Sequence, residues 1–146
     1  MMTLTALLGA KAEVAVPRLS PLPQQVASER VPLAGMWTFN GTSQIEVPGE
    51  WVMQGFEVEP GKEATYERVF QVPGSWKGKR VKLRCNGIYS QARIQVNGQA
   101  IGSHLGGFTA FELDVTKAIQ PGRDNRIRIG VTSETVADST SNGSFY

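Results

Sequence analysis

The stretch 86–116 constrains the fold more than any other part of the chain. Residues 91–96 alternate between polar and apolar, and a period of two is typical of a half-buried β-strand. Asn97-Gly98 follows directly, and both central residues of a type I′ turn need positive φ, which Asn and Gly tolerate best. The chain is therefore predicted to turn back as a β-hairpin, with a second strand beginning near residue 100.

The same pattern of short apolar runs and turn dipeptides recurs along the rest of the chain. About eight short strands separated by Gly, Pro and Asn turns predict an all-β fold, an antiparallel β-sandwich or barrel. A parallel sheet would need crossover helices, for which the chain has no room. The expected strands outside the hairpin are 33–39, 44–47, 65–72, 80–85, 108–113 and 126–132.

Arg68 has an unusual place in this pattern, because it shares a strand face with Tyr66, Phe70 and Val72. That phase turns a charged side chain towards the core, and an isolated buried charge is costly. Two arrangements would resolve the conflict. Arg68 is expected either to pair with a carboxylate or to be turned outwards by a β-bulge.

The chain length of 146 residues predicts one domain with two parts. Residues 1–32 contain Pro17, Pro21 and Pro23 and are expected to form an extended N-terminal lead-in. Residues 33–146 are expected to form the β-sandwich, truncated at its C-terminus. The apolar run 4–10 lacks a preceding basic residue, so it is a poor secretory signal unless it is the remnant of one. Localisation is therefore unknown, and a signal remnant would indicate a secreted or periplasmic protein.

Composition argues against several kinds of partner. The charge balance of 15 basic against 13 acidic residues gives a net charge of +2, which does not favour nucleic acid. No apolar run approaches ~20 residues, so no membrane span is expected. The single cysteine, Cys85, excludes an internal disulfide and is expected to be a buried core thiol. The single histidine, His104, lacks metal-ligand spacing, so neither a metal nor a cofactor is expected.

Aromatic and polar residues in irregular segments point to carbohydrate binding. Sugar rings stack on flat aromatic faces, and neighbouring polar groups bind their hydroxyls. The long loop 51–62 combines aromatic with polar side chains, and a second such group precedes the strand at 108–113; core packing is the alternative for each tryptophan. The predicted carbohydrate-binding residues are Trp51, Gln54, Phe56 and Glu57, with His104 and Phe108 as the second group.

No catalytic residues are predicted. A glycosidase needs two carboxyl groups about 5 to 9.5 Å apart across one sugar, and the sequence marks no such pair. Glu112 and Asp114 share one strand face but are flanked by turns, so they are expected to cap the chain or to pair with arginines.

A family resemblance rests on several segments in a fixed order: LAGMWTF, TYERVF, NGIYSQA, VNG, GGFTAFE, DVT and PG, between about residues 33 and 138. Together they resemble the N-terminal, sugar-binding domain of glycoside hydrolase family 2, which includes β-galactosidases, β-glucuronidases and β-mannosidases. The resemblance implies a jelly-roll sandwich of the galactose-binding-domain-like class. It also implies that catalysis belongs to a separate TIM barrel carrying two glutamates. An Asn that reaches the sugar in the family's β-galactosidases has no counterpart in 59–63.

The expected function is a non-catalytic carbohydrate-binding and scaffolding domain, which shapes the substrate pocket of a family 2 glycosidase acting on O-glycosyl bonds. A free-standing carbohydrate-binding module is the first alternative, and a small glycoside hydrolase acting alone is the second. The expected partner is a carbohydrate, either a β-glycoside or a polysaccharide. Self-association through an open sheet edge is also expected, because exposed edges recruit other chains.

Overall fold

The alternating segments form β-strands in a computed structural model, which describes residues 2–7 and 28–133. Within these ranges every strand pairing is antiparallel, which confirms the prediction of an all-β antiparallel sandwich. Two single-turn 3₁₀ helices, η1 (Val52–Gln54) and η2 (Gly74–Trp76), lie in connecting loops. The strands are β1 (Met2–Leu7), β2 (Glu29–Pro32), β3 (Gly35–Phe39), β4 (Ser43–Val47), β5 (Glu63–Gln71), β6 (Arg80–Cys85), β7 (Gln91–Val96), β8 (Gln99–Leu105), β9 (Phe111–Asp114) and β10 (Asp124–Thr132).

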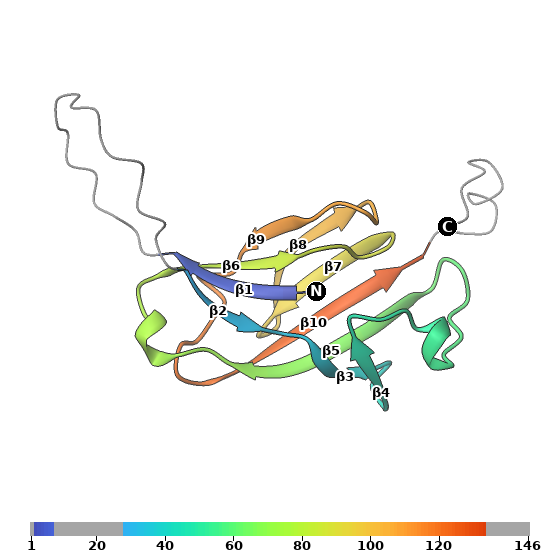
Figure 1. The fold of residues 1–146 in the computed structure, drawn as a ribbon, viewed down its shortest axis with the longest axis horizontal. Coiled ribbons are helices and arrows are strands. Elements are labelled where there is room, and N and C mark those ends of the chain that lie inside the picture. The colour runs from blue at the N-terminus through green and yellow to red at the C-terminus, as the bar shows by residue number, and fades with distance from the viewer. Residues whose placement is uncertain (1, 8–27, 134–146) are drawn as a thin grey trace, which may run out of the picture.

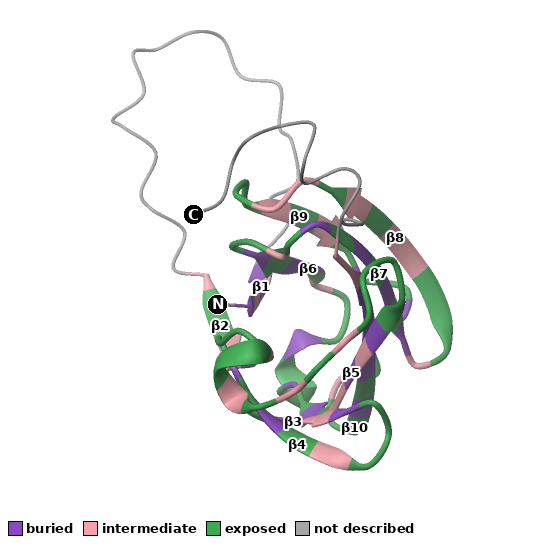
Figure 2. Cartoon of the chain, turned by 90° about the vertical axis from the view of Figure 1, so that its right-hand side faces the viewer, coloured by how far each residue is buried: buried purple, intermediate pink, exposed green. Residues whose placement is uncertain are grey.

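The strands are arranged in two sheets (Figure 1). The smaller sheet has the order β2-β1-β6-β9, and the larger has the order β4-β3-β5-β10-β7-β8. β10 lies inside the larger sheet, where it pairs with β5 on one side and β7 on the other. Viewed from one end, the larger sheet curves around the smaller one (Figure 2). The core lies between the two sheets, and β8 and β9 are neighbouring edges.

The predicted hairpin is present between β7 and β8. Asn97 and Gly98 have φ values of 50° and 78°, and the residues on either side of them are paired. Asn40 and Gly41 adopt the same combination, with φ values of 47° and 81°, between β3 and β4. Both turns follow from the ease with which Asn and Gly adopt positive φ.

The inward-facing residues form one hydrophobic core. Trp37 and Trp76 are fully buried, so the core alternative holds for these two tryptophans. Ile127 and Ile129 of β10 point inwards as the alternation predicts. Cys85 is also fully buried, as expected, and burial raises the pKa of its thiol to about 12. Such a thiol remains protonated at neutral pH and packs as a small apolar group.

The N-terminal segment differs from the expected lead-in, because two parts of 1–32 are strands of the smaller sheet. β1 lies between β2 and β6, and the buried side chain of Leu4 is in register with Val31 and Leu83. Threonines alternate with the buried residues of β1, so the segment has the period of a half-buried strand. The three prolines of the expected lead-in lie outside the described residues.

Both expectations for Arg68 are wrong. Its side chain lies on the inner side of β5, and no carboxylate among residues 2–7 and 28–133 accepts its hydrogen bonds. Nη1 donates to the carbonyl oxygens of Leu33 and Ala34, at 3.0 and 2.7 Å. β5 and β10 pair in continuous register, so no bulge turns the side chain outwards. The bend between β2 and β3 leaves carbonyl groups without a strand partner, and the guanidinium satisfies them.

Candidate carbohydrate-binding site

The predicted binding residues fall into two groups at one end of the sandwich. The first group lies in the β4–β5 loop around η1, and the second lies where β8 ends and β9 begins. Both loops are found near the end of β10 in Figure 1. The structure therefore brings the two groups to a common end of the fold, on different loops.

Two aromatic side chains of the first group are anchored to the core. The ring centroid of Phe39 lies 6.4 Å from that of Trp51 and 4.8 Å from that of Phe56. Both side chains are half-buried against the hydrophobic cluster. They hold the loop on β3, and only part of each ring is open to a ligand.

Gln54 and Glu57 of the same loop have different surroundings. The Gln54 side chain pairs with the backbone of Glu46 on the outer strand β4: Oε1 accepts from the amide nitrogen at 2.8 Å, and Nε2 donates to the carbonyl oxygen at 2.9 Å. It thus covers part of the β4 edge, as a neighbouring strand would. A Cβ on Gly49 would lie 2.5 Å from Nε2, so a larger residue there would displace the Gln54 amide. Glu57 is exposed and has no ion-pair partner among the described residues.

The second group is more accessible. Phe108 is 86% exposed, and its ring centroid lies 5.8 Å from that of the half-exposed Tyr89. The loops that carry them are joined by a 2.7 Å hydrogen bond from the Gly106 amide to the Ser90 carbonyl oxygen. His104 is stacked on Phe111, with centroids 4.0 Å apart. This group therefore presents an exposed aromatic pair beside a fixed imidazole.

Tyr89 is a member of this cluster that sequence reasoning missed. Its ring occupies the space beside Gly107, where a Cβ would lie 2.2 Å from a ring carbon. The signal available in the sequence was an aromatic residue just after an Asn-Gly dipeptide, facing a Gly-Gly pair some twenty positions later. That signal does not show that the two loops meet, because the contact depends on how the sheets pack.

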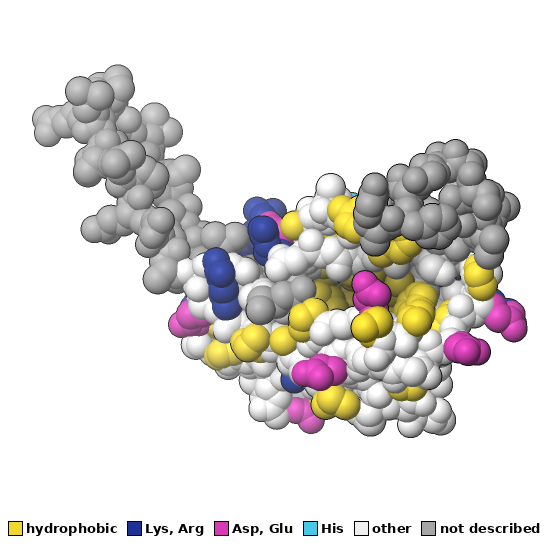
Figure 3. All heavy atoms as spheres, turned by 45° about the vertical axis from the view of Figure 1, so that its right-hand side comes forward, with side chains coloured by type: hydrophobic (Ala, Val, Ile, Leu, Met, Phe, Trp, Pro, Cys, Tyr) yellow, Lys and Arg dark blue, Asp and Glu magenta, His cyan; other side chains and the backbone are white. Residues whose placement is uncertain are grey.

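The surface at this end is mixed in character. Figure 3 turns it towards the viewer and shows hydrophobic side chains gathered on it, with acidic side chains among them. Leu105, at the end of β8, is 77% exposed, and Met53 of η1 is also exposed. Exposed apolar groups bordered by polar ones are typical of a surface that contacts a ligand or another domain.

The carboxylates of β9 are engaged with cations, as expected for two carboxylates flanked by turns. Glu112 lies 3.3 Å from both Lys82 and Arg84, and Asp114 lies 3.1 Å from Arg80. The hydrogen bond from Lys82, followed by that from Arg84, holds the pKa of Glu112 below its usual range. Hydrogen bonds from Thr116, then the Arg80 guanidinium, lower the pKa of Asp114. Both groups are ionised at neutral pH and are unsuited to donate a proton as a general acid.

Residues 2–7 and 28–133 contain no group of three or more His, Cys, Asp or Glu side chains placed to hold a metal ion. In the same ranges there is no helix of sufficient length and apolarity to cross a membrane.

A family described as the glycosyl hydrolase 2 galactose-binding domain-like family matches residues 53–143. Curated relatives match shorter stretches. A β-glucuronidase from Paenibacillus borealis is 44% identical over 68 residues, which are 47% of this chain and 11% of the relative. A β-galactosidase from Thermoanaerobacter pseudethanolicus is 38% identical over 74 residues, which are 50% of this chain and 10% of the relative.

Solved structures show the same fold. A β-glucuronidase from Ruminococcus gnavus aligns with a TM-score of 0.63 and 25% identity, covering 69% of this chain and 20% of that one. Another structure of that enzyme, in complex with D-glucuronic acid, aligns with a TM-score of 0.64. The chain thus spans between about a tenth and a fifth of the length of these relatives.

Proposed function

The chain belongs to the glycosyl hydrolase 2 galactose-binding domain-like family, and we propose that it is a non-catalytic carbohydrate-binding and scaffolding domain of a family 2 glycosidase. The observation that carries this proposal is the contrast between its carboxylates and its aromatic residues. Glu112 and Asp114 are held by cations, whereas Phe108 and Tyr89 are presented to solvent on joined loops. A surface of this kind can hold a sugar, whereas the β9 carboxylates, whose pKa values are lowered, are poorly suited to act as general acids.

The proposed scaffolding role concerns the same end of the sandwich. We place the contact with a catalytic barrel, and one wall of its substrate pocket, on the loops that carry Met53, Leu105 and Phe108. Their exposed apolar side chains supply the kind of surface that domains bury against one another. The relatives that match are between about five and ten times longer than the matched stretches, which leaves room in them for such a barrel.

A free-standing carbohydrate-binding module is the second candidate. The exposed Tyr89–Phe108 pair favours it, because an aromatic platform can bind a sugar without help from another domain. The two candidates differ in the affinity of the isolated chain. A free-standing module holds a glycan unaided, whereas a scaffolding domain binds it weakly.

Phe108→Ala is expected to weaken binding of methyl β-D-galactoside to the isolated chain by about tenfold, the equivalent of 1.4 kcal/mol, from a Kd near ~1 mM. The reason is the loss of the exposed ring on which the sugar stacks. Isothermal titration calorimetry measures the change. Val69→Ala is the matched control, because Val69 is an exposed apolar side chain in the middle of β5.

A companion variant separates the two predicted groups. If Trp51→Ala removes the affinity while Phe108→Ala leaves it intact, the sugar lies on the β4–β5 loop. If both variants bind as the unchanged chain does, neither predicted group contacts the sugar. Circular dichroism of each variant shows whether it is folded, since Trp51 also packs against Phe39.

We also propose that the chain self-associates weakly through a sheet edge. In the described part of the structure β2 is an outer strand of the smaller sheet, and its free side is unpaired. Static light scattering is expected to show an average mass that rises above 15.9 kDa as protein concentration increases. A mass that stays at the monomer value at all concentrations would show that the edge is protected. Pro32 and the four-residue length of β2 would then be the physical reason.

A further inference from the structure

The neighbouring edges of the two sheets, β8 and β9, meet at one end and separate at the other. His104 of β8 stacks on Phe111 of β9, and a Cβ on Gly102 would lie 3.1 Å from the Leu113 side chain. Towards the beginning of β8 the edges separate, and an open groove of about 630 Å³ lies there. The groove is therefore at the opposite end of β8 from Phe108.

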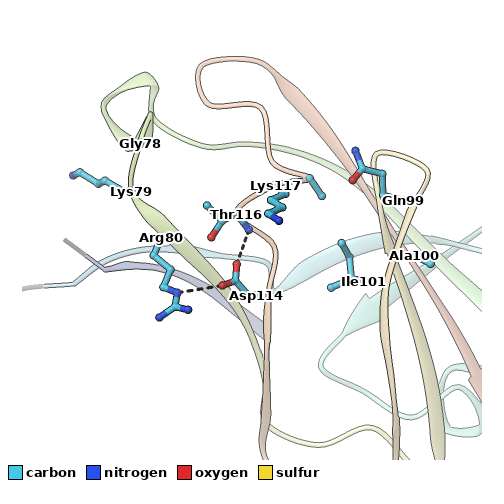
Figure 4. A pocket seen from close by; sticks show the side chains of 10 residues that line it. Gly78, Lys79, Arg80, Gln99, Ala100, Ile101, Asp114, Thr116 and Lys117 are labelled. Atoms are coloured by element: carbon cyan, nitrogen blue, oxygen red, sulfur yellow. Dashed lines mark hydrogen bonds and ion pairs between the residues drawn. The ribbon is translucent and has the colours of Figure 1, made fainter. Parts of the chain in front are cut away.

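Small residues leave the groove open, and polar side chains line it. Gly78, Ala100 and Ala118 are among its lining residues, and Ile101 adds an apolar surface. Figure 4 shows Arg80, Asp114 and Thr116 along one side and Gln99, Ala100 and Ile101 along the other, with Lys117 between them. The lining is mixed, with Ile101, Ala100 and Ala118 beside charged and amide side chains, and small-ligand sites likewise combine apolar contact with a few placed polar groups.

One wall of the groove is fixed by hydrogen bonds within the protein. Arg80 Nε donates to Asp114 Oδ2 at 3.1 Å, and Asp114 Oδ1 accepts from the Thr116 amide at 3.0 Å. The Thr116 hydroxyl oxygen in turn accepts from the amide of Val81 on β6, at 2.9 Å. A wall held in this way loses little conformational freedom when a ligand binds, which favours affinity.

The base of the groove is fixed as well. Asn97 of the hairpin donates from Nδ2 to the carbonyl oxygen of Ala118 at 2.7 Å and to Oδ1 of Asn125 at 2.8 Å. Asn125 is almost fully buried, and its amide also bonds to the backbone of Gln120. These bonds tie the turn that carries Lys117 to the β7–β8 hairpin.

The charged groups at the groove leave one positive charge unbalanced. Lys79 lies 3.6 Å from Glu29, and its side chain points away from the groove (Figure 4). Arg80 and Asp114 balance one another, and Arg80 uses only Nε for that bond, so its other N–H donors remain available. Lys117 is exposed and has no ion-pair partner among the described residues.

We propose that this groove binds an anionic carbohydrate, a sugar with one carboxylate. Lys117 holds the carboxylate, Gln99 binds ring hydroxyls, and Ile101 contacts the apolar face of the ring. One unbalanced cation suits a monoanion, whereas polyphosphates and nucleic acids need several. The site is separate from the sugar site proposed at Trp51 and Phe108, so this inference goes beyond the proposed function.

The test is a heteronuclear NMR titration of the ¹⁵N-labelled full chain with methyl β-D-glucuronide. The neutral methyl β-D-glucoside is the matched ligand, because it differs by a hydroxymethyl group in place of the carboxylate. We expect the glucuronide to shift the amides of Arg80, Ala100 and Lys117, with a Kd on the order of 1 mM. The glucoside should bind at least ~5-fold more weakly, and added salt should weaken glucuronide binding alone.

Substitutions of two lining residues test which side chains contact the ligand. Lys117→Gln is expected to weaken glucuronide binding by about 3- to 10-fold and to leave glucoside binding unchanged, because it removes one charge-assisted hydrogen bond. Gln99→Ala is expected to weaken both ligands. Lys77→Gln is the control, because Lys77 is an exposed lysine outside the groove.

Three results would overturn the inference. The first is equal affinity for the glucuronide and the glucoside, and the second is unchanged glucuronide binding by Lys117→Gln. Shifts confined to residues near Trp51 and Phe108 would also overturn it, while supporting the sugar site of the proposed function. Conversely, failure of both Phe108→Ala and Trp51→Ala to affect galactoside binding would count against the proposed function and leave the groove result intact.

Discussion

Leu4→Ala is expected to lower the free energy of unfolding by about 2 to 5 kcal/mol, the cost of removing a buried leucine side chain and leaving a cavity. Leu4 is fully buried on β1, where it is in register with Val31 of β2 and Leu83 of β6. A smaller residue there removes packing next to both neighbouring strands, β2 and β6, on the inner face of the smaller sheet. Urea denaturation followed by tryptophan fluorescence measures the change, provided that the m-value is the same for both proteins.

Thr5→Ala is the matched control for this variant. Thr5 is the next residue of the same strand and lies on its outer, less buried side, in register with Lys82. Its replacement should change stability by less than about 1 kcal/mol. Equal stability of Leu4→Ala and the unchanged chain would show that β1 is not part of the folded sandwich in solution. In that case the expected extended lead-in would describe residues 2–7 correctly.

The difference between β1 and the hairpin shows what local sequence can and cannot predict. The hairpin between β7 and β8 is predictable because Asn97-Gly98 fixes both the turn type and the register. Residues 2–7 carry no turn dipeptide, and their partner β6 begins more than seventy positions later in the chain. The short alternation of residues 2–7 is equally consistent with a β-strand and with part of an apolar leader. Only the pairing with β6 distinguishes a strand from a leader.

Arg68 shows a similar limit inside a correctly predicted strand. The period of two places its side chain on the inner side of β5, as the structure does. Its partners are the carbonyl oxygens of Leu33 and Ala34, which lie in the bend between β2 and β3. A sequence pattern identifies side chains that need partners, but it does not reveal which backbone groups lack a strand neighbour.

The sequence predicted which residues belong to the candidate site, but it did not predict how their side chains are arranged. Phe108 is exposed enough to serve as a platform, whereas Gln54 is bonded to the backbone of Glu46 and Phe56 packs on Phe39. Loop composition does not separate these roles, because aromatic and amide side chains are equally useful for anchoring a loop. The contribution of Tyr89 follows from the meeting of two loops, which depends on the packing of the sheets.

The second large effect is expected in catalysis: the isolated chain should not hydrolyse β-glycosides. Hydrolysis needs a proton donor and a nucleophile or base, rigidly placed on the two sides of one bond. The carboxylates of β9 have lowered pKa values because Lys82, Arg84, Arg80 and Thr116 donate hydrogen bonds to them. Without a suitable pair of carboxyl groups the rate enhancement of an enzyme, at least ~10⁶-fold, is lost.

The most direct test of the non-catalytic role is a hydrolysis assay on the purified chain. Release of nitrophenol is followed from 4-nitrophenyl β-glucuronide, β-galactoside and β-mannoside, with a family 2 glycosidase as the positive control. We predict a rate equal to that of buffer alone for all three substrates. Steady turnover of any of them that is abolished by Glu57→Gln or Glu112→Gln would contradict this prediction and identify the chain as a small glycoside hydrolase.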